Sequence, residues 1–179
     1  PVSCGMTVVI ASHEQIMNPI MLASVMRENN VDIISGTPSY WLNFVDMAEN
    51  SDVLKDACSR LKAAVIGGEA FVPALYTKLN AVNPELYLMN VYGPTETTVI
   101  CAIDVLKSEN DITIGLPCGN VHVATLDRDG RLQPRGAVGE LVIMSEGVAR
   151  GYLGRDELTK KSFITLLGKR AYRSGDLES

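Results

Sequence analysis

The first hundred residues alternate short apolar runs with stretches whose apolar residues recur at helical spacing. The apolar runs predict four strands, at residues 7–10, 31–35, 63–66 and 86–91. Asn18-Pro19 and Thr37-Pro38 each place a capping residue before a proline, which predicts that a helix begins there. A third helix is expected at residues 73–81. Repeated strand, turn and helix predicts right-handed crossovers and a mostly parallel sheet, part of a layered α/β subdomain.

The pattern changes after about residue 106. Short runs that favour strands occur at residues 112–114, 121–126 and 140–143, and glycines and prolines separate them. Asp129-Gly130 is typical of a hairpin turn. This part is expected to be a small β-rich subdomain, a distorted barrel. The polar stretch before residue 112 favours a boundary there, which gives domains at residues 1–107 and 108–179.

Composition and charge narrow the possible partners. The chain is 46% hydrophobic and 21% charged, which is ordinary for a globular protein with an apolar core. A net charge of −5 without a basic stripe argues against a nucleic acid or an anionic membrane as the main partner. The apolar runs are far shorter than the roughly 20 residues that span a bilayer. A cytoplasmic location is therefore expected. The four cysteines lie far apart in the sequence, so a metal site built on them is not expected. We expect their thiols to be reduced.

The candidate chemistry lies where the fourth predicted strand ends. Gly93-Pro94 stops that strand, so the next residues form a loop at the carboxyl edge of a parallel sheet, where such sheets bind ligands. The hydroxyl of Thr95 can donate to a phosphate, the carboxylate of Glu96 can hold Mg²⁺, and Tyr92 offers a flat face to a base. The alternative is a plain β-turn followed by a helix cap, without a ligand.

Three stretches together resemble a known family. Residues 90–98, Asn-Val-Tyr-Gly-Pro-Thr-Glu-Thr-Thr, resemble a signature of the adenylation domains of nonribosomal peptide synthetases, which are adenylate-forming enzymes. Residues 139–143 with 147–153, and then residues 172–177, resemble the next two motifs in the family's order. The Gly-Gly-Glu-Ala turn at residues 67–70 agrees as well. We regard the motif at residues 147–153 as mainly structural.

The resemblance implies a reaction, cofactors and roles for the loop residues. Such domains activate an amino acid with Mg-ATP to an aminoacyl adenylate and pyrophosphate. They then pass the acyl group to the phosphopantetheine thiol of a carrier-protein domain. By this likeness Tyr92 stacks on adenine, Asn90 meets its amino group, Gly93 belongs to the nucleotide-binding motif, Thr95 holds the α-phosphate and Glu96 the Mg²⁺. Thr95 and Glu96 are thus the expected catalytic residues.

The other two motifs are expected to complete the nucleotide site. By the same likeness, Gly68, Glu69 and Ala70 lie along the adenine through their backbone, and Asp176 accepts hydrogen bonds from the ribose hydroxyls. Ser174 stands where the family commonly has threonine. The alternatives are a strand-to-helix turn for Gly67-Gly68, a strand-end core position for Tyr92, a plain helix-start charge for Glu96 and a surface-turn position for Asp176.

The substrate is expected to be a neutral, apolar amino acid. Matching around the motifs places six uncharged residues along the substrate pocket: Ser35, Val65, Gly67, Val91, Val99 and Ile100. A charged substrate side chain would need a partner there. The alternative is that Val65, Val91 and Ile100 are only core residues.

The 179 residues are expected to be a fragment that is inactive by itself. The family's Ser/Thr/Gly-rich phosphate loop and its C-terminal subdomain with a catalytic lysine do not occur in this sequence. Two alternatives stay open for the parent protein: a free-standing amino-acid ligase of the D-alanine to carrier-protein type, and a degenerate nucleotide-binding module without chemistry.

Overall fold

The computed structural model describes residues 2–178, which form two compact units. Unit 1 contains residues 2–90 and 105–113, and unit 2 contains residues 91–104 and 114–178. Among these described residues, unit 1 is built around one hydrophobic cluster, and unit 2 contains three smaller ones. A single domain boundary between residues 107 and 108 stays a prediction, because the chain passes between the units more than once.

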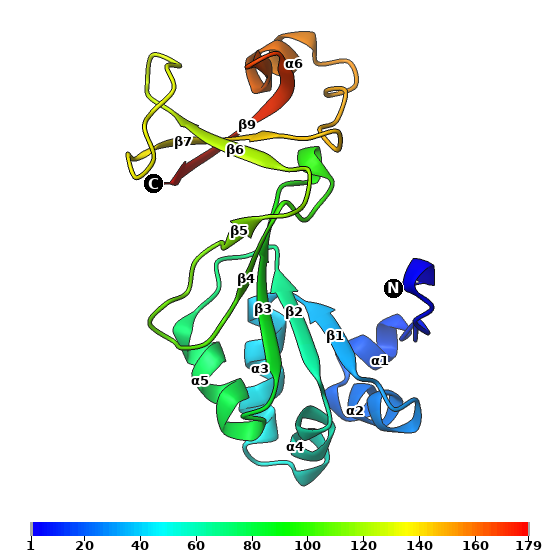
Figure 1. Ribbon diagram of the computed structural model, residues 1–179. Helices are drawn as coiled ribbons and strands as arrows, with labels where there is room; N and C mark the ends of the chain where they lie inside the picture. Colours follow the sequence, from blue (N-terminus) through cyan, green and yellow to red (C-terminus); the bar gives the residue numbers. More distant parts are fainter. Residues whose placement is uncertain (1, 179) are drawn as a thin grey trace. The chain divides into compact units, whose positions relative to one another are not determined.

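Unit 1 is an α/β structure (Figure 1). Its strands β1 and β2 pair in parallel, with Ser35 opposite Val65. The sheet that contains them has the strand order β1-β2-β3-β4-β5, and residues 91–92 of β3, residues 102–104 of β4 and all of β5 belong to unit 2. The strands of this sheet are β1 (Ile33–Gly36), β2 (Ala63–Gly67), β3 (Tyr87–Tyr92), β4 (Ala102–Val105) and β5 (Leu116–Pro117). The helices before β4 are η1 (Val2–Cys4), α1 (His13–Met17), α2 (Pro19–Glu28), α3 (Pro38–Ala48), α4 (Asp52–Ser59) and α5 (Pro73–Val82).

The capping residues set the start of α2 and α3. The side-chain oxygen of Asn18 accepts hydrogen bonds from the N–H groups of Ile20 at 3.1 Å and Met21 at 3.3 Å. Thr37 caps α3 by accepting from the N–H of Tyr40 at 3.4 Å. In both helices a proline occupies the first turn, where no hydrogen-bond donor is needed. Both predicted helix starts are confirmed.

Helices cover one face of the sheet in unit 1. The strands contribute Ile34, Ala64, Ile66 and Leu88 to a buried cluster, and α2, α3, α4 and α5 supply its other side. Because side chains alternate along a strand, Ser35, Val65 and Gly67 belong to the opposite, less buried face. The predicted layered α/β part with a mostly parallel sheet is confirmed.

Unit 2 contains an antiparallel sheet with the strand order β6-β7-β9-β8 (Figure 1). Its elements are β6 (His122–Leu126), β7 (Gly139–Met144), α6 (Asp156–Ser162), β8 (Phe163–Leu166) and β9 (Lys169–Glu178). The Asp129-Gly130 turn closes a hairpin in which Leu126 faces Leu132, as predicted. Gly130 has a φ of +77°, which glycine adopts without strain. The β-rich second part of the fold prediction is thereby confirmed.

Two predicted strands are wrong. Residues 7–10 form no strand, and their side chains lie in solvent, with Ile10 87% exposed. Residues 112–114 also form no strand.

Among the helices of residues 2–178, none is long and apolar enough to cross a membrane.

Candidate functional site

The chain turns sharply where β3 ends, and Gly93 makes this turn possible. The N–H of Cys101 donates to the carbonyl oxygen of Tyr92 at 2.8 Å, which brings the returning chain against β3. A Cβ atom on Gly93 would lie 2.5 Å from the carbonyl oxygen of Val99 and 2.8 Å from the nitrogen of Cys101. These neighbours are backbone atoms, so they cannot swing aside. The turn places the short 3-10 helix η2 (Thr95–Thr97) next in the chain.

Replacing Gly93 by alanine is therefore expected to destabilise unit 2 by about 1–3 kcal/mol, the usual cost of overpacking. The matched control is Gly119→Ala, because a Cβ atom there meets nothing within 4 Å and its φ is not positive. The measurement is the denaturant midpoint of both variants against the parent. Equal midpoints for the two variants would show that the turn tolerates a side chain.

The loop after η2 has an unusual backbone conformation. Another segment holds this loop in place through hydrogen bonds. Thr98 and Val99 have φ values of 67° and 70°, in a region that β-branched residues rarely adopt. The hydroxyl of Thr98 donates to the carbonyl oxygen of Gly147 at 2.7 Å, and the N–H of Ala149 donates to the carbonyl oxygen of Glu96 at 2.7 Å. Such conformations persist where surrounding contacts fix them. The segment at residues 147–149 thus fixes the loop.

The carboxylate of Glu96 belongs to a small network of aromatic residues. The hydroxyl of Tyr152 donates to Glu96 Oε1 at 2.5 Å, and the hydroxyl of Tyr172 lies 3.3 Å from that of Tyr152. The hydrogen bond from Tyr152 lowers the pKa of Glu96, and partial burial opposes this effect. The pKa of Tyr172 is raised, mainly by burial. Glu96 is therefore a carboxylate anion at neutral pH.

The surroundings of Glu96 fit a magnesium ion that is shared with phosphate groups. Mg²⁺ is usually held by one or two carboxylates together with substrate phosphates and water, rather than by an all-protein cage. Glu96 is only half-buried, and Thr95 beside it is exposed. No group of three or more histidine, cysteine, aspartate or glutamate side chains that could hold a metal occurs within residues 2–178. A single carboxylate beside an exposed hydroxyl is consistent with such a shared site.

Tyr92 and Asp176 meet in unit 2 although 84 residues separate them in sequence. The hydroxyl of Tyr92 donates to Asp176 Oδ2. Burial, and then this hydrogen bond, raises the pKa of Tyr92. Ser174 orients the aspartate, because its hydroxyl accepts from the N–H of Asp176 at 3.0 Å and donates to the carbonyl oxygen of Leu141 at 2.9 Å. Since any hydroxyl side chain can make both bonds, serine can replace the family's usual threonine.

The turn after β2 is exposed to solvent, and the side chain of Glu69 in this turn contacts Ser39 at the start of α3. Gly68 has a φ of +86°, and Gly68, Glu69 and Ala70 are all exposed. The carboxylate of Glu69 accepts from the N–H of Ser39 at 3.1 Å and from its hydroxyl at 2.9 Å. These bonds lower the pKa of Glu69. Glu69 therefore stabilises the start of α3, where an anion is favourable, and its backbone remains accessible.

Asn90 is buried at the end of unit 1 in β3. Its side-chain nitrogen donates to the carbonyl oxygen of Thr113 at 2.7 Å. This contact holds the carbonyl group of Thr113, which belongs to a segment that forms no strand. The amide nitrogen of Asn90 thus has a structural partner within the described chain.

The six predicted pocket residues are divided between the units. Ser35 and Val65 are direct neighbours across β1 and β2, and Gly67 follows on the same face. Unit 2 contains the other three: Val91, Val99 and Ile100. Val99 is 64% exposed and Ile100 39% exposed, so neither is a core residue of unit 2. The core alternative is therefore wrong for Ile100.

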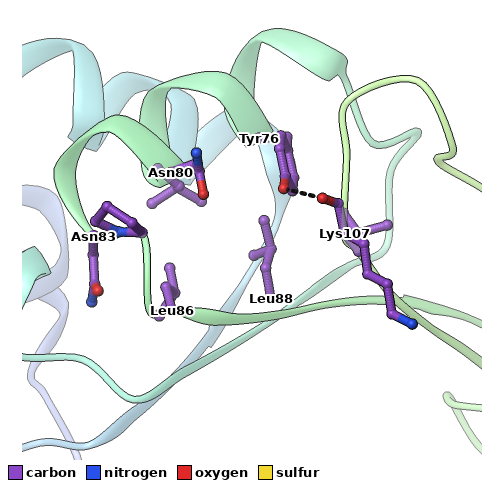
Figure 2. A pocket seen from close by; sticks show the side chains of 9 residues that line it. Tyr76, Asn80, Asn83, Leu86, Leu88 and Lys107 are labelled. Atoms are coloured by element: carbon purple, nitrogen blue, oxygen red, sulfur yellow. Dashed lines mark hydrogen bonds between the residues drawn. The ribbon is translucent and has the colours of Figure 1, made fainter.

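A cavity in unit 1 lies apart from the predicted site residues. It has a volume of about 310 Å³ and lies between the end of α5, the start of β3 and residues 106–107. Figure 2 shows Tyr76 at its edge, donating a hydrogen bond to the carbonyl oxygen of Lys107 at 2.6 Å. Unit 2 has a second cavity of about 400 Å³, lined by residues that include His122 and Lys169. None of the predicted site residues lines either cavity.

Sequence reasoning did not assign roles to Tyr152 and Tyr172. The motif at residues 147–153 is structural as predicted, since it fixes the loop, but it also supplies the tyrosine that contacts Glu96. Both tyrosines stand inside the motif stretches, at Gly151-Tyr152-Leu153 and at the start of residues 172–177. The presence of a polar aromatic residue within each motif was the sequence signal that could have indicated these roles.

Comparisons with known proteins identify the family of the chain. The AMP-binding enzyme family matches residues 1–153. Gramicidin S synthase 2 of Brevibacillus brevis is 34% identical over 181 residues, covering 99% of this chain and 4% of the synthase. Tyrocidine synthase 3 of Brevibacillus parabrevis is 33% identical over 181 residues, covering 99% of this chain and 3% of the synthase.

Solved structures give the same result. A holo four-domain nonribosomal peptide synthetase bound to AMP and glycine has a TM-score of 0.80 and 32% identity, over 94% of this chain and 12% of that chain. A nonribosomal peptide synthetase protein with adenylation and PCP domains has a TM-score of 0.78 and 30% identity, over 89% and 33%. The chain spans only a small part of these relatives. It belongs to the AMP-binding enzyme family, as a piece of an adenylation domain of the nonribosomal peptide synthetase kind.

Proposed function

We propose that the protein containing this chain activates an amino acid with Mg-ATP. The products are an aminoacyl adenylate and pyrophosphate, and the acyl group then passes to the phosphopantetheine thiol of a carrier-protein domain. The observation that carries this proposal is the contact between Tyr92 and Asp176. A base and its ribose are covalently joined, so the groups that bind them must lie within a few ångströms of each other.

Tyr92 and Asp176, the two residues of this contact, are assigned to the adenosine part of ATP. The ring of Tyr92 stacks on adenine, and Asp176, an exposed carboxylate, accepts hydrogen bonds from the ribose hydroxyls. Asn90 directs its side-chain nitrogen to Thr113, which leaves the amide oxygen as the group suited to the amino group of adenine. Gly68, Glu69 and Ala70 in unit 1 are exposed, and their role toward the base stays a prediction.

The phosphates are assigned to the loop after β3. The exposed hydroxyl of Thr95 binds the α-phosphate, and Glu96 holds the Mg²⁺. The cation, when bound, neutralises phosphate charge as the substrate carboxylate approaches phosphorus. Glu96 contributes a fixed anion, and Thr95 orients the reacting group. The residues act by alignment and electrostatics, and no covalent enzyme intermediate is needed.

The amino acid is proposed to be neutral and apolar. The six pocket residues carry no charge, and burying a charged substrate group without a partner is costly. Exposed Val99 and Ile100 in unit 2 offer apolar surface to a substrate side chain. The carrier-domain partner is supported by the relative that combines adenylation and PCP domains.

The test is amino-acid-dependent exchange of labelled pyrophosphate into ATP by the full-length protein, across all standard amino acids. We expect one neutral, apolar amino acid, or a few similar ones, to drive exchange. Exchange driven only by charged amino acids would contradict the pocket assignment and leave the chemistry intact. No exchange with any amino acid would favour the degenerate nucleotide-binding module.

A further inference from the structure

We propose that Tyr152 is a positioning residue that orients the Glu96 carboxylate toward the divalent cation of the nucleotide. This inference rests on the proposed role of Glu96 as the residue that holds Mg²⁺. It assigns a specific task to the motif at residues 147–153, whose contribution otherwise is to fix the loop.

The contact between the two side chains is short and has a fixed direction. The hydroxyl of Tyr152 lies 2.5 Å from Glu96 Oε1. An ionised carboxylate only accepts hydrogen bonds, so Tyr152 must be the donor. Hydrogen bonds to a charged acceptor are the shorter and stronger kind. One oxygen of Glu96 thus has a defined partner, which restricts rotation of the carboxylate.

Tyr152 is itself held in place by aromatic packing of its ring and by a hydrogen bond of its backbone. Its ring packs edge-on against Phe163, with centroids 5.3 Å apart, and Phe163 in turn packs against Tyr172 at 5.2 Å. The N–H of Tyr152 donates to the hydroxyl of Thr159 at 2.9 Å. Side chains that are locked by packing position a functional group more precisely than mobile ones. The hydroxyl of Tyr152 therefore has a defined place relative to its own backbone.

The same segment also holds the backbone of Glu96. The N–H of Ala149 donates to the carbonyl oxygen of Glu96, and Gly147 accepts from the hydroxyl of Thr98. Backbone and side chain of Glu96 are therefore tied to one short stretch of the chain. This double attachment goes beyond what is needed to hold a loop, because the bond from Tyr152 reaches the carboxylate itself.

A phenol suits this task because it orients a carboxylate without cancelling its charge. A lysine or arginine at the position of Tyr152 would form an ion pair with Glu96 and compete with the cation. Mutation of a group that hydrogen-bonds a metal-binding side chain commonly changes metal affinity by about 10–100-fold. Tyr152 stands in that relation to Glu96.

The experiment compares Tyr152→Phe with Tyr76→Phe in the full-length protein. Each change removes one phenol hydroxyl, and the control loses a 2.6 Å bond to the carbonyl oxygen of Lys107 in unit 1. Mn²⁺ serves as the probe, in the presence of a non-hydrolysable ATP analogue, with protein in excess over the analogue. Loss of the free Mn²⁺ electron paramagnetic resonance signal reports binding. Both changes are repeated with Glu96→Ala.

We expect Tyr152→Phe to weaken Mn²⁺ binding about tenfold and Tyr76→Phe to leave it unchanged. In the Glu96→Ala background, Tyr152→Phe should have no further effect, because the two residues act on the same ion. Unchanged Mn²⁺ binding in Tyr152→Phe, with weakened binding in Glu96→Ala, would overturn this inference alone. Unchanged binding in Glu96→Ala would overturn both this inference and the proposed metal role of Glu96.

Discussion

Replacing Glu96 by alanine is expected to lower kcat/KM for amino-acid-dependent pyrophosphate exchange by about 10²–10³-fold, the usual cost of losing one fixed electrostatic group at a reaction centre. The change removes the one carboxylate of η2. The backbone contact from Ala149 uses the carbonyl oxygen of Glu96 and survives the substitution. Activity should therefore fall much more than stability.

The matched control for this prediction is Glu85→Ala. Glu85 is an exposed carboxylate in unit 1, between α5 and β3, so its loss changes the net charge equally. Exchange is measured with both variants at saturating ATP and at several Mg²⁺ concentrations, and thermal melting is recorded alongside. Comparable exchange rates for the Glu96 and Glu85 variants would rule out a catalytic role for Glu96.

Replacing Asp176 by alanine is expected to raise KM for ATP about 10²–10⁴-fold and to change kcat much less. Hydrogen bonds to a charged group contribute about 1.5–3 kcal/mol each, and the proposal assigns two ribose hydroxyls to this carboxylate. The bond is to a part of the nucleotide that does not react, so its loss should weaken binding more than chemistry.

Two companion variants make the Asp176 result specific. Tyr92→Phe keeps the ring and loses only the hydroxyl that contacts Asp176, so KM for ATP should rise less than tenfold. Ser174→Thr keeps the hydroxyl that accepts from the N–H of Asp176 and should change little. The measurement is KM for ATP in the exchange assay. An unaltered KM in Asp176→Ala would remove the ribose role.

Local chemistry made part of the fold predictable. The starts of α2 and α3 follow from Asn18 and Thr37, because a capping side chain and a proline satisfy or remove the free N–H groups of a first turn. Strand β2 follows from an apolar run that ends in glycine. In each case the signal and the structure involve neighbouring residues.

Elements that depend on distant contacts were not predictable. β9 (Lys169–Glu178) is mostly polar, but it pairs with β7 on one side and β8 on the other. Helix α4 (Asp52–Ser59) has no side-chain cap and is stabilised by buried Leu54 and Ala57. Conversely, residues 7–10 have strand-like composition but no strand partner in the described chain. In all three, the presence or absence of tertiary contacts decided the structure, whatever the intrinsic propensity.

The same limit applies to the site. The motifs identified Tyr92, Glu96 and Asp176 by type, and the structure brings the first and third together. The bond between Glu96 and Tyr152 joins residues 56 positions apart, and no sequence spacing indicates such a contact. Residue types thus indicated the candidate chemistry, and only the fold showed how the groups are held.

The most direct test of the nucleotide site is a crystal structure of the full-length protein with a non-hydrolysable aminoacyl-AMP analogue. We predict that the Asp176 carboxylate lies within hydrogen-bonding distance of the ribose hydroxyls and that the ring of Tyr92 stacks on the adenine. A nucleotide bound elsewhere, for instance in the cavity beside Tyr76 and Lys107, with neither contact formed, would contradict the account.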